Sequence, residues 1–91
     1  MQNIDYNYSV RIKAIRRFNV KDIEIGNRLR LARVEKDLTQ QELADRAGVT
    51  RQTIGLIEAG KYNPTLRLCL MLARITEKTL DELFWIEGEI E

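Results

Sequence analysis

Three polar side chains stand together at the start of a predicted helix, residues 50–59. Arg51 can donate two hydrogen bonds to guanine O6 and N7, Gln52 can pair with adenine N6 and N7, and Thr53 can reach a phosphate or a thymine methyl group. Side chains of this kind read base edges when the start of such a recognition helix enters the major groove. Leu56, one turn further on, can contact a methyl group or the rim of the groove. The pattern predicts binding to duplex DNA.

A second set of residues is suited to phosphate contacts, which set the register of a protein on DNA without reading its sequence. Gln40 lies in the first turn of the preceding predicted helix, where the positive end of the helix favours an anion. Thr50 comes directly before the recognition helix, and Lys61 and Asn63 follow it in a predicted loop. Two alternatives stay open: Gln40 as a solvated first-turn residue, and Lys61 as ordinary surface charge.

The helix that carries Gln40 has an unusually complete start signal. Thr39 and Glu42 have the spacing of a capping box, in which each side chain accepts a hydrogen bond from the backbone of the other. Gly48 can adopt the left-handed conformation that ends a helix. We therefore expect a helix over about residues 39–47.

The recognition helix follows after only Gly48 and Val49. Thr50 is its expected N-cap, and Gly60 is expected to end it in the same way as Gly48 ends the first helix. Two short helices joined by so tight a break are typical of a helix-turn-helix. Gly55 lies inside the recognition helix, either because DNA or the first helix approaches closely or because a small residue is simply tolerated there.

Three further helices are expected at residues 23–36, 65–75 and 80–87. The first has Ile25, Leu29 and Ala32 at helical spacing, so these residues should face the core. The second is apolar on nearly every face, which predicts burial on more than one side. The third begins with another capping box at Thr79 and Glu82, the residues that mark its start.

The first 21 residues have no single clear pattern. Residues 10–13 alternate as a strand would, whereas Ile15 and Phe18 fit a helix. We expect a short strand followed by irregular chain. The predicted organisation is an N-terminal extension over residues 1–21 and one helix-turn-helix DNA-binding domain over residues 22–91.

Composition excludes several classes of site. The chain has no His and a single Cys, Cys69, which rules out a Cys/His zinc site, a His-dependent triad and an intramolecular disulfide. No group of residues resembles an acid–base pair, so we predict no enzyme, no catalytic residue, no metal and no cofactor. The sequence also lacks an apolar run long enough for a membrane span and the apolar core of a signal peptide, and we expect a cytoplasmic protein.

The formal net charge of +1 hides an uneven distribution. Residues 1–36 carry a net charge of +5, residues 37–75 carry +1, and residues 76–91 carry −5. A basic face toward DNA and an acidic face away from it would give this pattern. Solvated surface charge with no partner is the alternative.

Four segments together resemble the lambda-repressor-like Cro/cI (XRE) family of helix-turn-helix transcriptional regulators. They are Leu-Thr-Gln-Gln-Glu-Leu-Ala at 38–44, Ala-Gly-Val-Thr-Arg-Gln-Thr-Ile at 47–54, Ile-Glu-x-Gly-Lys at 57–61 and Asn-Pro-Thr-Leu at 63–66. The resemblance extends over residues 25–86. It implies an all-α, compact five-helix lambda-repressor-like DNA-binding domain, here with a short N-terminal extension, and members of the family commonly bind as dimers.

The resemblance also implies roles for single residues. The glutamine that matches Gln40 contacts phosphate in the family, and the positions that match Arg51, Gln52 and Leu56 face base edges. An arginine matching Arg33 pairs with a glutamate matching Glu58, which would make both of these residues structural. Two unrelated surface charges are the alternative for Arg33 and Glu58.

The sequence departs from the family pattern at Leu31 and Val34, which are apolar where polar residues are usual, and at Glu77, where a glycine commonly ends the helix. The N-terminal extension is a third departure, with three interpretations. It covers Leu31 and Val34 with apolar side chains, it forms a basic arm along DNA, or it is disordered or not part of the natural translation product. The apolar set is Val10, Ile12, Ile15 and Phe18, and the basic set is Arg11, Lys13, Arg16 and Arg17.

The surplus apolar surface of the predicted helix over residues 65–75 and of residues 83–86 predicts a homodimer, because exposed patches of this kind mark interfaces. Trp85 is the expected anchor, unless it covers the core of its own monomer. A two-fold dimer would place two recognition helices about 34 Å apart on a palindromic operator. The expected interface residues are Met71, Phe84, Trp85 and Ile86.

The sequence thus predicts a sequence-specific regulator of transcription that binds double-stranded DNA and represses by occupying its operator. One alternative is the antitoxin of a toxin–antitoxin pair, which would also bind a toxin protein. Another is a protein-interaction module of the same fold that no longer binds DNA. Steep salt dependence of binding would favour DNA over the last of these.

Overall fold

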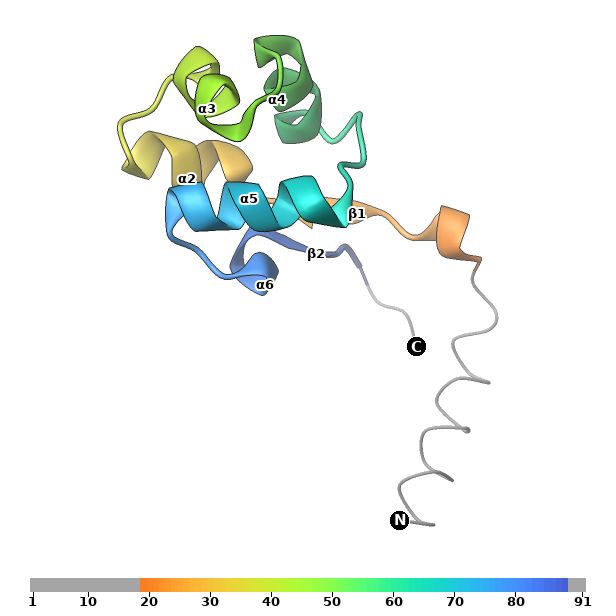
Figure 1. Ribbon diagram of the computed structural model, residues 1–91. Helices are drawn as coiled ribbons and strands as arrows, with labels where there is room; N and C mark the ends of the chain where they lie inside the picture. Colours follow the sequence, from red (N-terminus) through yellow and green to blue (C-terminus); the bar gives the residue numbers. More distant parts are fainter. Residues whose placement is uncertain (1–18, 89–91) are drawn as a thin grey trace. The chain divides into compact units, whose positions relative to one another are not determined.

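The computed structural model describes residues 19–88 of the chain (Figure 1). Residues 25–85 form one compact unit, and residues 19–24 and 86–88 belong to a second. The described residues contain five α-helices, one short 3-10 turn and one two-stranded sheet, which confirms the predicted fold class. The elements are η1 (Val20–Asp22), β1 (Ile25–Asn27), α2 (Leu29–Glu35), α3 (Gln40–Ala47), α4 (Arg51–Glu58), α5 (Leu66–Thr76), α6 (Leu80–Leu83) and β2 (Phe84–Ile86).

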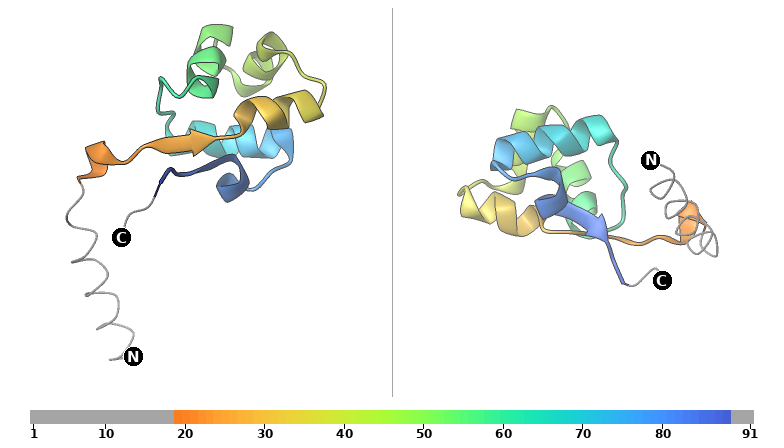
Figure 2. Two further views of the ribbon diagram at one scale, coloured as in Figure 1. Left: turned by 180° about the vertical axis from the view of Figure 1, so that it is seen from behind. Right: turned by 90° about the horizontal axis from the view of Figure 1, so that it is seen from below.

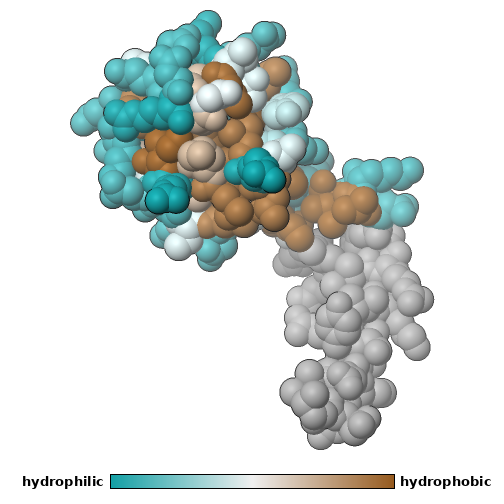
Figure 3. Space-filling view, viewed as in Figure 1, coloured by the Kyte–Doolittle hydropathy of each residue, from teal (hydrophilic) through white to brown (hydrophobic). Residues whose placement is uncertain are grey.

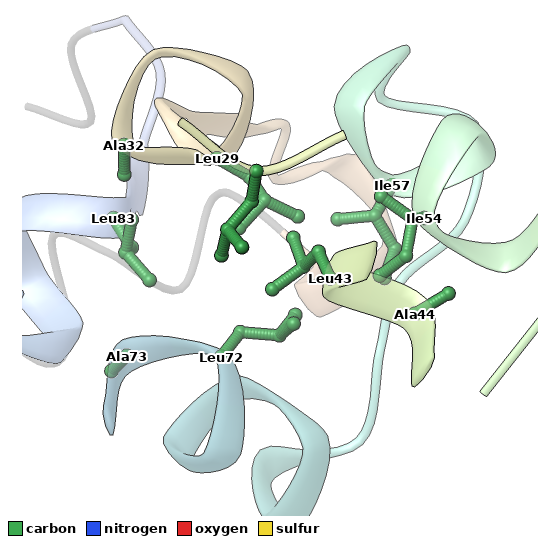
Figure 4. Packing of buried hydrophobic residues seen from close by; sticks show 10 residues of the cluster. Leu29, Ala32, Leu43, Ala44, Ile54, Ile57, Leu72, Ala73 and Leu83 are labelled. Atoms are coloured by element: carbon green, nitrogen blue, oxygen red, sulfur yellow. The ribbon is translucent and has the colours of Figure 1, made fainter. Parts of the chain in front are cut away.

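A single hydrophobic core holds the five helices together (Figure 4). Leu43 of α3 is fully buried near the middle of this core, with Leu29 of α2, Ile54 of α4 and Leu72 of α5 around it. Full burial of such a side chain contributes about 1.5–3 kcal/mol, so the core fixes the helices relative to one another. Its members are Leu29, Ala32, Leu38, Leu43, Ala44, Ile54, Ile57, Leu72, Ala73 and Leu83.

Helices α3 and α4 lie side by side and carry the predicted helix-turn-helix (Figure 1). Helix α3 also packs on α5, and α2 packs on both α4 and α5. The view from behind shows the same arrangement (Figure 2). One face of α4 therefore packs on the core, and its opposite face is exposed.

The predicted boundaries of α3 are confirmed. Thr39 Oγ1 accepts a hydrogen bond from the Glu42 amide at 3.0 Å, and Glu42 Oε1 accepts one from the Thr39 amide at 2.8 Å. Gly48 ends the helix with φ +75°, a conformation that disfavours any residue with a Cβ. This backbone turn directs the chain straight into α4.

Helix α4 begins and ends as the sequence indicates. Thr50 Oγ1 accepts a hydrogen bond from the Thr53 amide at 3.1 Å, which caps the first turn. At the other end, the amides of Gly60 and Lys61 donate to the carbonyls of Ile57 and Leu56, both at 2.9 Å. These two bonds form a Schellman motif, which closes the helix with its last carbonyls satisfied.

The prediction of a helix over residues 23–36 is wrong in its first turn and a half. Helix α2 begins at Leu29, and Ile25–Asn27 form strand β1. Leu29 and Ala32 face the core as expected, but Ile25 is exposed. A strand forms here because its partner is β2, far away in the sequence, and such non-local pairing leaves no periodic signal near residue 25.

The prediction of a helix over residues 80–87 is also wrong beyond its first turn. The capping box at Thr79 and Glu82 is present, but α6 ends at Leu83 and β2 follows. The Arg28 amide donates to the Leu83 carbonyl at 2.9 Å, and the Glu87 amide donates to the Glu24 carbonyl at 2.8 Å, a pattern that makes the strands antiparallel. Phenylalanine, tryptophan and isoleucine favour strands, which explains the change.

Helix α5 is less enclosed than its apolar sequence predicts. Leu72 and Ala73 are buried, whereas Leu66, Leu70 and Met71 are exposed. The exposed apolar side chains share the outward face of the helix with the exposed Arg67 and Arg74, and Figure 3 shows hydrophobic residues gathered over α5 on the side of the molecule that it displays. An apolar helix in this small fold thus presents an uncovered stripe.

The departures from the family pattern have structural counterparts. Glu77 ends α5 in the left-handed conformation, with φ +59°, where glycine would be less strained. Leu31 and Val34 are exposed on α2. The predicted strand over residues 10–13 and the side chains proposed to cover Leu31 and Val34 lie outside the described residues.

Candidate nucleic-acid interface

The start of α4 presents its polar side chains on the face away from the core. Ile54 and Ile57 are buried, and the spacing of the helix places Arg51 and Gln52 on the exposed side. Thr53 is half-buried, and its hydroxyl lies 3.0 Å from the hydroxyl of Thr50. The arrangement places two long hydrogen-bonding side chains on the exposed face of α4.

Other residues predicted to contact DNA lie further along this helix or beside it. Leu56 is exposed one turn along α4. Lys61 and Asn63 are exposed in the segment between α4 and α5. Thr50 is exposed, and its hydroxyl already serves as the helix cap. Contact from Thr50 to a phosphate would therefore use the same oxygen that holds the first turn.

Arg33 and Glu58 form a nearly buried ion pair between α2 and α4. Arg33 Nε donates to Glu58 Oε2 at 2.7 Å, and the same guanidinium donates to Glu58 Oε1 at 3.2 Å. Only 11% of the Arg33 side chain and 6% of the Glu58 side chain are exposed. A third bond, from Arg33 to the Leu38 carbonyl at 2.8 Å, completes the partners of the guanidinium. The end of α4 is thereby fixed against α2.

Gln40 joins this ion pair to the start of the recognition helix. Its Nε2 donates to Glu58 Oε1 at 3.0 Å, and its Oε1 accepts from Arg51 at 3.1 Å. The four side chains form one chain of hydrogen bonds from Arg33 through Glu58 and Gln40 to Arg51. A residue predicted to bind phosphate is thus in direct contact with a residue predicted to read bases.

An open depression of about 710 Å³ lies over this network. Its charged side chains are three arginines and one glutamate, so its local charge is positive. It is lined by Arg30, Arg33, Thr39, Gln40, Gln41, Arg51, Gly55, Glu58 and Ala59. Such a depression is suited to an anionic partner.

Gly55 forms part of the floor of the depression. A Cβ at this position would lie 3.8 Å from Gln40 Nε2, which is an ordinary van der Waals contact. The packing of α3 against α4 therefore does not require glycine here. Close approach of α3 therefore does not explain the glycine. Close approach of DNA and simple tolerance of a small residue stay as explanations.

Asn27 is a supporting residue that sequence reasoning missed. Its Nδ2 donates to the Ile57 carbonyl at 2.9 Å, and its Oδ1 accepts from the Leu29 amide at 3.0 Å. One side chain therefore binds the first backbone amide of α2 and holds the end of α4. An asparagine just before an apolar helical pattern is a known signal for a helix start. The signal was not used because the predicted helix over residues 23–36 placed Asn27 inside the helix.

The residues predicted for a dimer interface do not share one environment. Phe84 packs against the core, and Trp85 is half-buried with the Arg28 guanidinium 4.6 Å from the centre of its ring. Met71 and Ile86 are exposed.

The described residues contain no group of three potential metal ligands and no helix long and apolar enough to cross a membrane.

Comparison with known proteins agrees with this geometry. The helix-turn-helix family matches residues 29–83, more than half of the chain. An uncharacterized HTH-type transcriptional regulator of Archaeoglobus fulgidus is 44% identical over 62 residues, which are 68% of this chain and 89% of the relative. The HTH-type regulator YgzD of Bacillus subtilis is 35% identical over 63 residues, or 69% and 96% of the two chains.

Solved structures show the same fold. The restriction-modification controller protein C.AhdI from Aeromonas hydrophila superposes with a TM-score of 0.56 at 35% identity, over 59% of this chain and 82% of that one. The fold and the polar face of α4 define a DNA-binding helix-turn-helix transcriptional regulator. The chain belongs to the helix-turn-helix family and is of the Cro/cI-like (XRE) type.

Proposed function

We propose that this protein is a sequence-specific repressor that acts as a homodimer by occupying a palindromic operator. The observation that carries the proposal is the exposed start of α4, where Arg51 and Gln52 project from a helix fixed by the Arg33–Glu58 pair. A repressor of this kind needs no chemistry, because a bound protein excludes other proteins from the same DNA.

In this proposal Arg51, Gln52, Thr53 and Leu56 face the base edges. Arg51 and Gln52 offer the paired hydrogen-bonding groups that discriminate guanine and adenine in the major groove. Backbone phosphates are bound by Gln40, Thr50, Lys61 and Asn63, which flank the reading face.

We further propose that two copies meet on the exposed stripe of α5, formed by Leu66, Leu70 and Met71. Met71 belongs to the interface set expected from the sequence, and the two leucines extend it along the same helix face. The proposal rests on the exposure of three large apolar side chains in a chain whose family is expected to bind DNA as dimers.

Selection of bound sequences from random duplexes tests the function. A palindromic consensus with two half-sites about one helical turn apart is expected for a dimer that inserts two recognition helices. Recovery of no consensus would contradict sequence-specific reading. A single, non-repeated half-site would retain DNA reading and contradict the dimer.

Sedimentation of a Leu70→Glu variant tests the α5 interface. Leu70 is 52% exposed in one copy, so the substitution should leave the fold intact but place a charge in the interface. The variant should sediment as a monomer where the wild type is a dimer. Leu31→Glu is the matched control, because Leu31 is 55% exposed on α2 and should not affect assembly. A dimeric Leu70→Glu variant would contradict this interface.

A further inference from the structure

The depression over the hydrogen-bonded network contains more positive charge than the network uses. Three arginines line it, and Glu58 is the only acidic side chain among its lining residues. Glu58 is already paired with Arg33, whose guanidinium also donates to the Leu38 carbonyl. The surplus charge therefore comes from Arg30 and Arg51.

Of the three arginines that line the depression, Arg30 is the one that makes no structural contact with the described residues. It is exposed on α2, and within residues 19–88 its guanidinium has no hydrogen-bond or ion-pair partner. Arg51 differs, since it donates to Gln40 at 3.1 Å. An arginine that lines a depression without a partner in its own chain is available to an anionic ligand.

The position of the depression indicates which anion. Gln40 and Arg51 line it together with Arg30, so a ligand there would lie beside the start of the recognition helix. A duplex seated on α4 brings its phosphodiester backbone along the edge of the reading face. Arginine suits such a phosphate because it offers two parallel N–H groups.

We propose that Arg30 binds a backbone phosphate of the DNA in this depression, as an additional contact outside the helix-turn-helix itself. This inference rests on the proposed DNA-binding function. The contact sets register and affinity but does not read sequence, because phosphates are the same at every base pair. It also makes α2 part of the DNA-binding surface, although α2 otherwise serves to support α4.

The test is the salt dependence of binding by an Arg30→Ala variant, measured by fluorescence anisotropy on two duplexes, one selected and one scrambled. Loss of one phosphate contact should reduce the slope of log affinity against log salt by about 0.9. The fold-loss of affinity at low salt should be equal for the two duplexes. Arg30→Lys should recover most of the slope, since it keeps the charge.

Arg46→Ala is the matched control, because Arg46 is also exposed on a helix and does not line the depression. Its slope should equal that of the wild type. Chemical denaturation should show unchanged stability for Arg30→Ala, as Arg30 has no partner to lose. An unchanged slope for Arg30→Ala, or a loss confined to the selected duplex, would overturn the role of Arg30 alone. A wild type that binds neither duplex would overturn the proposed function as well.

Discussion

The side chain of Arg51 donates a hydrogen bond to Gln40 Oε1 at 3.1 Å, across the break between α3 and α4. The bond joins the residue expected to read guanine to the residue expected to bind phosphate. Gln40 is itself held by Glu58, so Arg51 is oriented by a chain of contacts that begins in the nearly buried Arg33–Glu58 pair. Base recognition by Arg51 and phosphate binding by Gln40 are therefore expected to be energetically coupled.

A double-mutant cycle on Arg51 and Gln40 measures this coupling. Arg51→Ala should relax the preference at one base pair, by about 1–3 kcal/mol. Gln40→Ala should weaken binding to all sites and, because Arg51 loses its acceptor, should also reduce the preference at that base pair. Affinities for the selected site and for its single-base variants provide the measurement. Strictly additive losses would show that the bond does not orient Arg51 on DNA.

Truncation of the ion pair should be a stability effect. Removing one partner of a buried pair leaves the other charge uncompensated, and Glu58→Ala should reduce the free energy of unfolding by about 3–5 kcal/mol. Urea denaturation provides the measurement. The exposed Lys36–Glu77 pair serves as the control. Its two charged groups are 2.7 Å apart, and the Glu77 side chain is 73% exposed, so Glu77→Ala should cost little stability. A Glu58→Ala loss no larger than that of Glu77→Ala would contradict the buried role.

Asn27 should be required for the placement of α4 against α2. Asn27→Ala removes two hydrogen bonds, each contributing about 0.5–1.5 kcal/mol, and leaves the Ile57 carbonyl without its side-chain donor. Asn27→Ser keeps a neutral acceptor that can reach the Leu29 amide and loses the donor to Ile57, so its loss of stability should be smaller than that of alanine. Denaturation of the two variants under identical conditions checks the order. Equal losses would contradict separate roles for the two atoms.

Gly55 and Gly48 should respond in opposite directions to alanine. Gly55→Ala should raise the free energy of unfolding by about 0.5–1 kcal/mol, because alanine favours the helix and the added Cβ meets Gln40 at ordinary contact distance. Gly48→Ala should lower it, since φ +75° strains any residue with a Cβ. Thermal unfolding compares the two variants. A destabilised Gly55→Ala variant would contradict the helical argument.

DNA affinity of the Gly55→Ala variant then distinguishes the two explanations for the glycine. A variant that is more stable and binds DNA more weakly would show that the duplex approaches the backbone of α4 at this position. A variant with unchanged affinity would show that the small residue is merely tolerated.

Acid sensitivity should originate partly in the two capping boxes. A hydrogen bond from the Thr39 backbone lowers the pKa of Glu42 from its ordinary 4.5, and the Thr79 backbone does the same for the pKa of Glu82. A lowered pKa in the folded state gives stability that is present above pH 4.5 and is lost as pH falls through the folded value. A double Glu42→Gln, Glu82→Gln variant keeps the acceptors without titrating. Its stability should decline less between pH 5 and 3 than that of the wild type, and equal declines would contradict the assignment.

The elements that the sequence predicts well are those whose signals are local. The capping box at Thr39 and Glu42 and the left-handed Gly48 fix α3, and Thr50 with Gly60 fixes α4. Each of these signals acts within one turn of the chain. The helix-turn-helix could therefore be placed to within a residue at each end.

The errors fall where structure depends on distant residues. Strand β1 exists because β2 pairs with it, and no pattern around residue 25 carries that information. The capping box at Thr79 marks where α6 begins but not where it ends, and the following Phe84–Ile86 segment favours a strand. Surplus apolar surface on residues 65–75 is expected from the sequence, but the sequence does not tell that Leu66 and Leu70 carry it, since a core side chain and an interface side chain are equally apolar.

In the candidate site too, the features with local signals were predictable and those that depend on distant residues were not. The types and spacing of Arg51, Gln52 and Gln40 suggested their roles directly. The bonds from Gln40 to Glu58 and from Asn27 to Ile57 join residues 18 and 30 positions apart, and only the folded chain brings them together.

Helix α4 is held at its start by Thr50 and Gln40, and at its end by Asn27, Glu58 and the turn at Gly60. A helix fixed in this way before DNA arrives loses little further conformational entropy when it enters the groove. Encounter should then be equally fast on correct and incorrect sites, because it depends mainly on charge. The choice among sites is expected to be made afterwards, in how long the protein stays on each.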